Sequence, residues 1–124
     1  MIQIERIYDI SLSHDDNPCF TILVDRLWPR GLRKDQVRVD LWLKDIAPSS
    51  QLRRWFGHDP AKWDAFKERY FAELDSKSEL VQVILDKAKK NTICLLYGAK
   101  DETHNNAVAL KELLDYRLGN IAMH

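Results

Sequence analysis

Basic side chains gather in one short segment of the chain, together with a tryptophan. The members of this segment are Arg26, Trp28, Arg30, Arg33, Lys34 and Arg38, and only Asp35 opposes their charge. Guanidinium groups bind phosphate or carboxylate through paired hydrogen bonds, and an indole can stack on a base. These residue types therefore predict a local anion site. The structural alternative is that Trp28 belongs to the core and that the arginines pair with acidic residues.

A second polar segment extends from Tyr97 to Asn106, between an apolar run and an apolar helical pattern. Its candidate functional residues are Tyr97, Lys100, Asp101, His104 and Asn105. Free N–H groups at the start of a helix bind anions, and His104 or Lys100 could transfer protons. Several of these residue types are also good helix caps, so a purely structural loop is the alternative.

A third cluster lies between these two segments in the sequence. It consists of Lys44, Ser49, Arg53, Trp55, Gly57, His58 and Asp59. We expect Lys44 and Arg53 to support binding of the anion. Ser49 and Asp59 also suit capping positions, and Trp55 also suits the core, so a structural role is the alternative.

The sequence lacks the motifs of several familiar sites. Its four glycines form neither a phosphate-binding loop nor a dinucleotide-binding loop, and no nucleophile elbow occurs. Cys19 and Cys94 lie in apolar runs, where cysteines are usually inert core residues, and the histidines match no zinc spacing. We therefore expect no cofactor and no metal, although His58 and His104 could still meet in space with nearby aspartates.

The strand pattern indicates how these segments are positioned. Ile2 to Glu5 alternates between apolar and polar residues, as a strand near a sheet edge does, and a polar turn is expected at residues 14–18. Residues 19–24 and 92–97 are nearly continuous apolar runs, typical of central strands that are covered on both faces. The alternation from Val37 to Leu43 predicts a further half-buried strand.

Four helices are expected between and after these strands. Ser49 or Ser50 caps the first, which ends at Gly57, and the second begins at Asp59 followed by Pro60. Ser76 or Ser78 caps the third, and the fourth covers about residues 104–118. Strands joined by helices predict a small three-layer α/β/α domain with a mainly parallel sheet, Rossmann-like without its Gly-rich nucleotide loop, over residues 1–124. Ligands of such sheets bind at the carboxyl ends of the strands, where both polar segments begin.

Composition limits the partners. The formal net charge is zero, with 19 basic and 19 acidic residues, so any attraction to nucleic acid must be local. No apolar stretch approaches the roughly 20 residues of a membrane helix, and no signal peptide is evident. We expect a cytoplasmic protein whose partner is an anionic small molecule or nucleic acid, and we leave a homodimer open.

Four motifs resemble the YeaO-like branch of the domain-of-unknown-function 488 family. They lie at residues 24–31, 42–49, 53–60 and 96–101, in order along nearly the whole chain. The resemblance implies a small α/β domain of uncharacterised activity. The wider family pairs an Asp-Val-Arg type motif, matched here by Asp25 and Arg26, with a cysteine-containing loop. Here Tyr97-Gly98-Ala99 and Asn105-Asn106-Ala107 replace that loop, so the family's cysteine chemistry does not transfer and only Arg26 carries over cleanly.

Three functions are therefore compared. The first is a small enzyme acting on an anionic substrate, such as a nucleotide or modified base, with Arg26 and Arg30 holding the anion and His104 or Lys100 transferring protons. The second is a noncatalytic module that binds phosphate or single-stranded nucleic acid, with Trp28 as a stacking surface. The third is a protein-interaction domain with exposed tryptophans.

Overall fold

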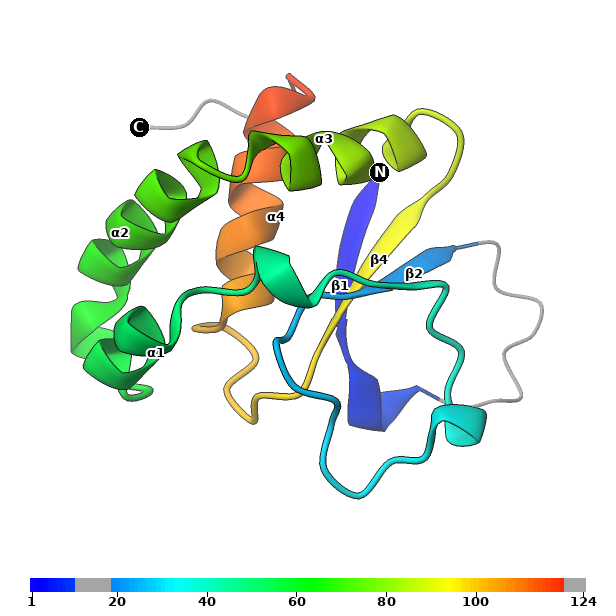
Figure 1. The fold of residues 1–124 in the computed structure, drawn as a ribbon, viewed down its shortest axis with the longest axis horizontal. Helices are drawn as coiled ribbons and strands as arrows, with labels where there is room; N and C mark the ends of the chain where they lie inside the picture. Colours follow the sequence, from blue (N-terminus) through cyan, green and yellow to red (C-terminus); the bar gives the residue numbers. More distant parts are fainter. Residues whose placement is uncertain (11–18, 120–124) are drawn as a thin grey trace.

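A parallel four-stranded sheet forms the centre of the molecule (Figure 1). The computed structural model describes residues 1–10 and 19–119, so the turn predicted at residues 14–18 and the tail from residue 120 lie outside this part. The strands are β1 (Ile2–Arg6), β2 (Phe20–Leu23), β3 (Leu41–Trp42) and β4 (Ile93–Tyr97), in the order β1-β4-β2-β3. Every pairing is parallel. The edge position of β1 and the central positions of the two apolar runs are confirmed.

Four α-helices follow β3 and β4. They are α1 (Ser50–Phe56), α2 (Trp63–Asp75), α3 (Ser78–Ala88) and α4 (Asn106–Arg117). Ser49 caps α1 by accepting the Leu52 N–H at 3.1 Å, and Gly57 ends it in the left-handed conformation, with φ +55°. Asp59 caps a 3₁₀ turn (Pro60–Lys62) that leads into α2, so the second predicted helix begins as a 3₁₀ helix. No helix among the described residues is long and apolar enough to cross a membrane.

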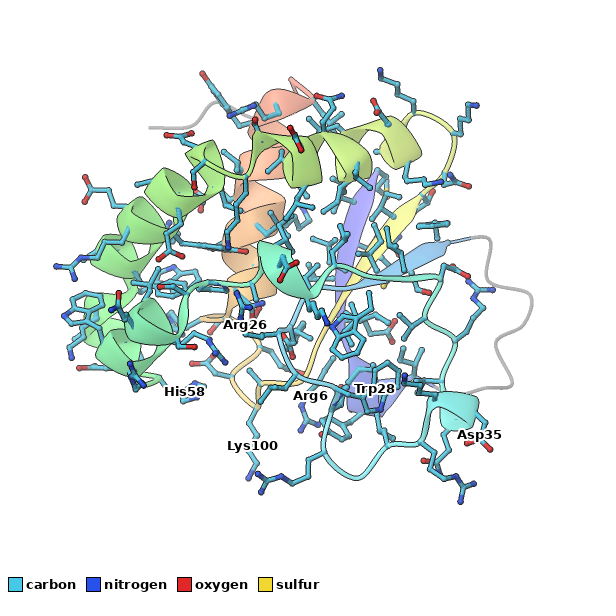
Figure 2. All side chains as sticks on the ribbon, viewed as in Figure 1. Arg6, Arg26, Trp28, Asp35, His58 and Lys100 are labelled. Atoms are coloured by element: carbon cyan, nitrogen blue, oxygen red, sulfur yellow. The ribbon has the colours of Figure 1, made fainter. Side chains whose placement is uncertain are left out.

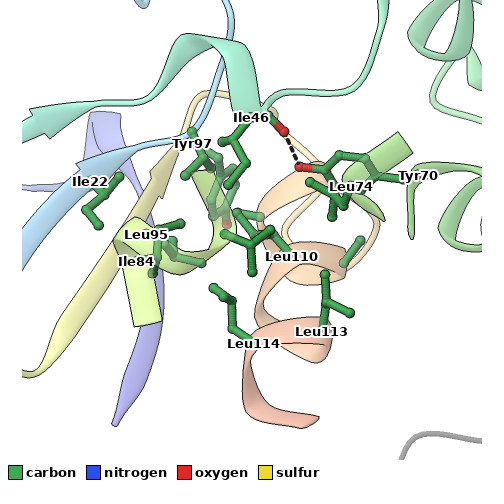
Figure 3. Packing of buried hydrophobic residues seen from close by; sticks show 14 of the residues in the cluster. Ile22, Ile46, Tyr70, Leu74, Ile84, Leu95, Tyr97, Leu110, Leu113 and Leu114 are labelled. Atoms are coloured by element: carbon green, nitrogen blue, oxygen red, sulfur yellow. Dashed lines mark hydrogen bonds between the residues drawn. The ribbon is translucent and has the colours of Figure 1, made fainter. Parts of the chain in front are cut away.

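All four α-helices pack on the same face of the sheet. Side chains from each helix join the sheet residues Ile22 and Leu95 in one buried cluster. Figure 3 shows the side chains that α2, α3 and α4 contribute to it. Tyr70 of α2 is fully buried in this cluster and donates a hydrogen bond of 2.7 Å to the carbonyl of Ile46. This bond connects α2 to the 3₁₀ helix Lys44–Ile46, which directly follows β3.

The other face of the sheet is covered without an α-helix in the described part of the chain. Leu23, Cys94 and Leu96 point into a second buried cluster. Its cover comes from the 3₁₀ helix Ile7–Asp9 and from residues of the segment between β2 and β3, including Val37. The small parallel α/β fold is thus confirmed, whereas the expected helical layer on this face is replaced by 3₁₀ and irregular backbone.

Two local predictions need correction: the strand expected at 37–43 is shorter, and the expected serine cap of the third helix is absent. Only Leu41 and Trp42 of the alternating segment 37–43 form a strand, because side chains replace part of the expected ladder: the Thr21 N–H donates to the Asp40 carboxylate at 2.8 Å, and the Thr21 hydroxyl donates to the carbonyl of Arg38. Neither Ser76 nor Ser78 caps α3. The Ser76 hydroxyl instead donates to the Glu73 carbonyl at the end of α2, since the two helices are separated by only two residues.

Candidate functional site

A pocket of about 290 Å³ lies at the carboxyl ends of β2 and β4. Residues of the segments that follow these strands line it, together with residues of α1 and its neighbours. Figure 2 shows Arg26 and His58 together at this end of the molecule. The lining residues are Asp25, Arg26, Leu27, Ala47, Pro48, Arg53, Phe56, His58, Phe66, Ala99, His104, Asn105 and Asn106.

Asp25 places a carboxylate at the end of β2. Its Oδ2 accepts the Gly98 N–H at 2.8 Å, and its Oδ1 accepts the Asn106 side-chain amide at 3.2 Å. Asn106 also donates to the carbonyl of Val24 at 3.0 Å, so the start of α4 is connected to the end of β2. Burial raises the pKa of Asp25, and the two hydrogen bonds and the charge of Arg53 offset part of that rise.

Two guanidinium groups supply positive charge to the pocket. Arg26 follows Asp25 in the chain, and its Nη1 lies 3.7 Å from the carboxylate of Asp45, which is 71% exposed. The Arg26 Nε is buried and has no hydrogen-bond partner among the described residues. Arg53 of α1 donates to the Ser50 hydroxyl at 3.1 Å. Because an exposed ion pair contributes little, Arg26 retains most of its capacity to bind an anion.

The wall formed by α1 is held in place by Glu73 of α2. The Glu73 carboxylate accepts the Ser49 backbone N–H at 2.8 Å and the Ser49 hydroxyl at 2.6 Å. Because Ser49 is also the N-cap of α1, this pair fixes the helix that carries Arg53 and Phe56 into the pocket. Phe56 packs against Phe66 with ring centroids 4.4 Å apart, which makes this side of the pocket apolar.

His104 lines the pocket and is oriented by Asp101. Its Nδ1 lies 3.1 Å from the Asp101 Oδ2, and its ring meets the ring of Trp63 edge-on, with centroids 5.4 Å apart. Since an ionised carboxylate can only accept, the Nδ1 carries the proton and the Nε2 of the neutral ring is an acceptor. This arrangement is the usual one for a histidine that takes up a proton.

We predict that the stabilising effect of Asp101 is lost in acid. Hydrogen bonds from the Thr103 backbone, its hydroxyl and His104 lower the pKa of Asp101 to about 2, below the ordinary value of roughly 3.9. A lowered folded-state pKa stabilises the fold above the unfolded value, and the effect disappears as pH falls from about 4 to about 2. Asp101→Asn should therefore lower the melting temperature at pH 7 but not at the acid end of this window.

Thermal unfolding of wild type and Asp101→Asn across this pH range measures the difference. Glu102→Gln is the matched control, because the adjacent Glu102 is exposed. A difference in melting temperature between wild type and Asp101→Asn that is the same at every pH would contradict the lowered pKa of Asp101.

The pocket brings together four of the residues predicted from sequence: Arg26, Arg53, His104 and Asn105. Asn105 is buried and caps α4 by accepting the Val108 N–H at 3.0 Å. His58, which the sequence placed in the third cluster, also lines the pocket, whereas the remaining residues predicted to bind or react do not. Asp101 contacts it through His104, Tyr97 is buried in the core, and Trp28, Arg30, Lys44 and Lys100 lie outside it. Lys100 extends away from the body of the molecule (Figure 2).

The tryptophans are half-buried, and none is exposed. Trp28 and Trp42 contact each other edge-on, and their indole N–H groups donate inward to the carbonyls of Leu32 and Asp25. The Nζ of Lys34 lies within about 6 Å of both rings. This packing favours the core alternative for Trp28 over a free stacking surface.

Sequence reasoning gave no functional role to Asp25 or Asn106, and it gave His58 only a supporting one. Asp25 is the first residue after the apolar run 19–24, and this position was the available signal. His58 carries a backbone φ of +58°, which is uncommon for a residue with a side chain and which occurs mainly where the surrounding structure enforces it. His58 and His104 both line the pocket, but no group of three metal-ligating residues occurs within residues 1–10 and 19–119.

Comparison with known proteins identifies the family. A family model described as the inactive DUF488-N3 subclade matches residues 1–122. The chain is 41% identical over 113 residues to the uncharacterized protein YeaO of Escherichia coli, covering 91% of this chain and 96% of YeaO. It is 34% identical over 116 residues to the uncharacterized protein Mb3100c of Mycobacterium bovis, covering 94% and 95% of the two chains. No solved structure matches significantly. The chain therefore belongs to the DUF488 family, in the YeaO-like branch that its four motifs indicated.

Proposed function

We propose that this protein binds a small anionic molecule in the pocket at the carboxyl ends of β2 and β4, without converting it. The observation that carries this proposal is the Arg26 side chain. Its Nε is a buried cationic donor without a hydrogen-bond partner in the described part of the chain, and the residue lines the pocket beside Arg53. The Nε is closed to solvent, so an oxyanion in the pocket would meet the accessible part of the Arg26 side chain, which is 34% exposed and is paired only with the exposed Asp45 carboxylate among the described residues.

One further feature supports an anion at this place. Asn105 and Asn106 line the pocket at the start of α4, where the first N–H groups of a helix lack intrahelical acceptors and favour negative charge. The description of the matching subclade as inactive favours binding without turnover. Cys94 is a free, buried thiol, which supports a reducing compartment such as the cytoplasm.

Calorimetric titration with inorganic phosphate, at low and moderate ionic strength, tests the proposal. We expect saturable binding to one site that weakens as salt rises, because the attraction is partly screened. Absence of saturable binding at low salt, with phosphate, sulfate and short carboxylates alike, would remove the proposal.

A second candidate function is proton transfer to the bound molecule, which would make the protein an enzyme. The specific observation in its favour is the Asp101–His104 pair, which leaves an imidazole acceptor at a residue that lines the pocket. If this function operates, His104→Ala should abolish conversion of a bound compound. The affinity for that compound, measured from its thermal stabilisation of the protein, should stay within about twofold of wild type. Conversion is followed by NMR on the same samples. Absence of conversion in wild type would leave only the binding function, whereas unchanged conversion in His104→Ala would remove His104 from the proton transfer.

A further inference from the structure

A carboxylate such as that of Asp25 is unexpected in a site that only binds anions. Its carboxylate lines the same pocket as Arg26 and Arg53, where a second negative charge repels an anionic ligand. A neutral side-chain oxygen, such as that of asparagine, would satisfy the Gly98 N–H equally well. The presence of a carboxylate therefore needs an explanation beyond the support of the loop.

The carboxylate is also held firmly in one orientation. Gly98 and Asn106 each donate to one of its oxygens, and Asn106 is anchored in turn to the Val24 carbonyl. A Cβ on Gly98 would lie only 3.3 Å from Oδ2, so the backbone approaches the carboxylate more closely than a side chain would comfortably allow. A carboxylate offers roughly four acceptor positions, and these two donors occupy only half of them.

We infer that Asp25 binds the ligand directly, and that the ligand carries an ammonium or hydroxyl donor beside its anionic group. This inference rests on the proposed anion pocket. The ligand's anionic group pairs with Arg26 or Arg53, and its donor pairs with the free acceptor positions of Asp25. The raised pKa of Asp25 fits this role, since a buried carboxylate gains more from a cationic or hydroxyl partner than an exposed one does.

The apolar side of the pocket specifies a third part of the ligand. Phe56, Phe66 and Pro48 line this side, and Leu27, which is 70% exposed, lies at its edge. Burying an apolar group against these side chains is favourable, whereas a second charged group there would lose its hydration. The class of ligand is therefore a small amino acid or hydroxy acid with an apolar substituent.

Three compounds that share one skeleton test this class: 3-phenylpropanoate, 3-phenyllactate and phenylalanine, which carry no donor, a hydroxyl and an ammonium beside the carboxylate. Calorimetry at pH 7.5 should show that wild type binds the two donor-bearing compounds at least about tenfold more tightly, the usual worth of a hydrogen bond to a charged group. Asp25→Asn should reduce the preference for phenylalanine to less than about threefold, because the ion pair is removed.

Arg26→Ala is the matched variant. It should weaken binding of all three compounds by similar factors and retain the preference among them, since it removes only the partner of the shared carboxylate. Melting temperatures of both variants establish that they are folded. Asp25→Asn removes a buried charge but also removes the acceptor of the Asn106 amide, so its melting temperature is compared with that of wild type before binding is measured.

The outcomes separate this inference from the proposed function. Two outcomes would overturn the role of Asp25 without contradicting the anion pocket. In both, wild type binds phosphate; in one it binds the three carboxylates with equal affinity, and in the other it binds none of them. A preference that persists in Asp25→Asn would also overturn the role of Asp25. Failure of phosphate and of all three carboxylates to bind wild type would overturn both.

Discussion

Replacing Arg26 with alanine should weaken the binding of inorganic phosphate by roughly 10- to 100-fold, the range expected for loss of a charge-assisted hydrogen bond to an oxyanion. The effect is large because Arg26 lines the pocket and its guanidinium is only loosely paired, with Nη1 3.7 Å from the exposed carboxylate of Asp45. Stability should change little, since the Arg26 side chain is 34% exposed and its carboxylate partner is mostly in water.

Arg117→Ala is the matched control for Arg26→Ala. Arg117 is exposed at the last turn of α4, whereas the pocket lies at the first turn, so the two ends are separated by the length of a twelve-residue helix, roughly 18 Å. The control removes the same charge and should leave phosphate affinity within about twofold. Equal losses in the two variants would mean that binding reflects the overall charge of the protein.

Arg26→Lys separates charge from geometry. Lysine retains the positive charge but cannot form the paired hydrogen bonds of a guanidinium group. We expect an affinity for phosphate between those of wild type and Arg26→Ala. An affinity equal to that of wild type would assign the binding to charge alone and would leave the unpartnered Nε without a role.

The elements that sequence predicted best were those determined by local chemistry. The two apolar runs formed central strands because a buried parallel strand needs apolar side chains on both faces. Ser49, Gly57 and Asp59 occupy the capping positions expected of them, because a cap depends on a few neighbouring residues only. The alternation at 37–43 was misleading, since apolar residues there fill the second cluster from irregular backbone.

The site was only partly predictable for a different reason. The rule for parallel sheets placed the segments after β2 and β4 at one end of the molecule, and Arg26, Arg53, His104 and Asn105 do line one pocket. Sequence does not state the direction of a side chain in a loop. It therefore could not show that Trp28 packs inward and that Lys100 extends outward. Asp25 is recognised as a candidate only from its burial and its contact with Gly98.

The wall of the pocket depends on the core beneath it, and Tyr70→Phe should show this dependence as a loss of about 1–3 kcal/mol in the free energy of unfolding. The Tyr70 hydroxyl donates to the Ile46 carbonyl at 2.7 Å, and the next residues, Ala47 and Pro48, line the pocket. Phenylalanine would leave that carbonyl buried without its partner. Because burial raises the pKa of Tyr70, the donor keeps its proton throughout the neutral range.

Denaturant unfolding of Tyr70→Phe measures this loss, with Tyr116→Phe as the control. Tyr116 is 46% exposed on α4, so removal of its hydroxyl should change stability by less than about 0.5 kcal/mol. If the two variants are equally stable, the bond to Ile46 contributes nothing. If Tyr70→Phe is destabilised and also binds phosphate more weakly, the position of residues 44–48 against α2 controls the pocket. The fully buried Tyr70 then influences the affinity of a site that it does not line.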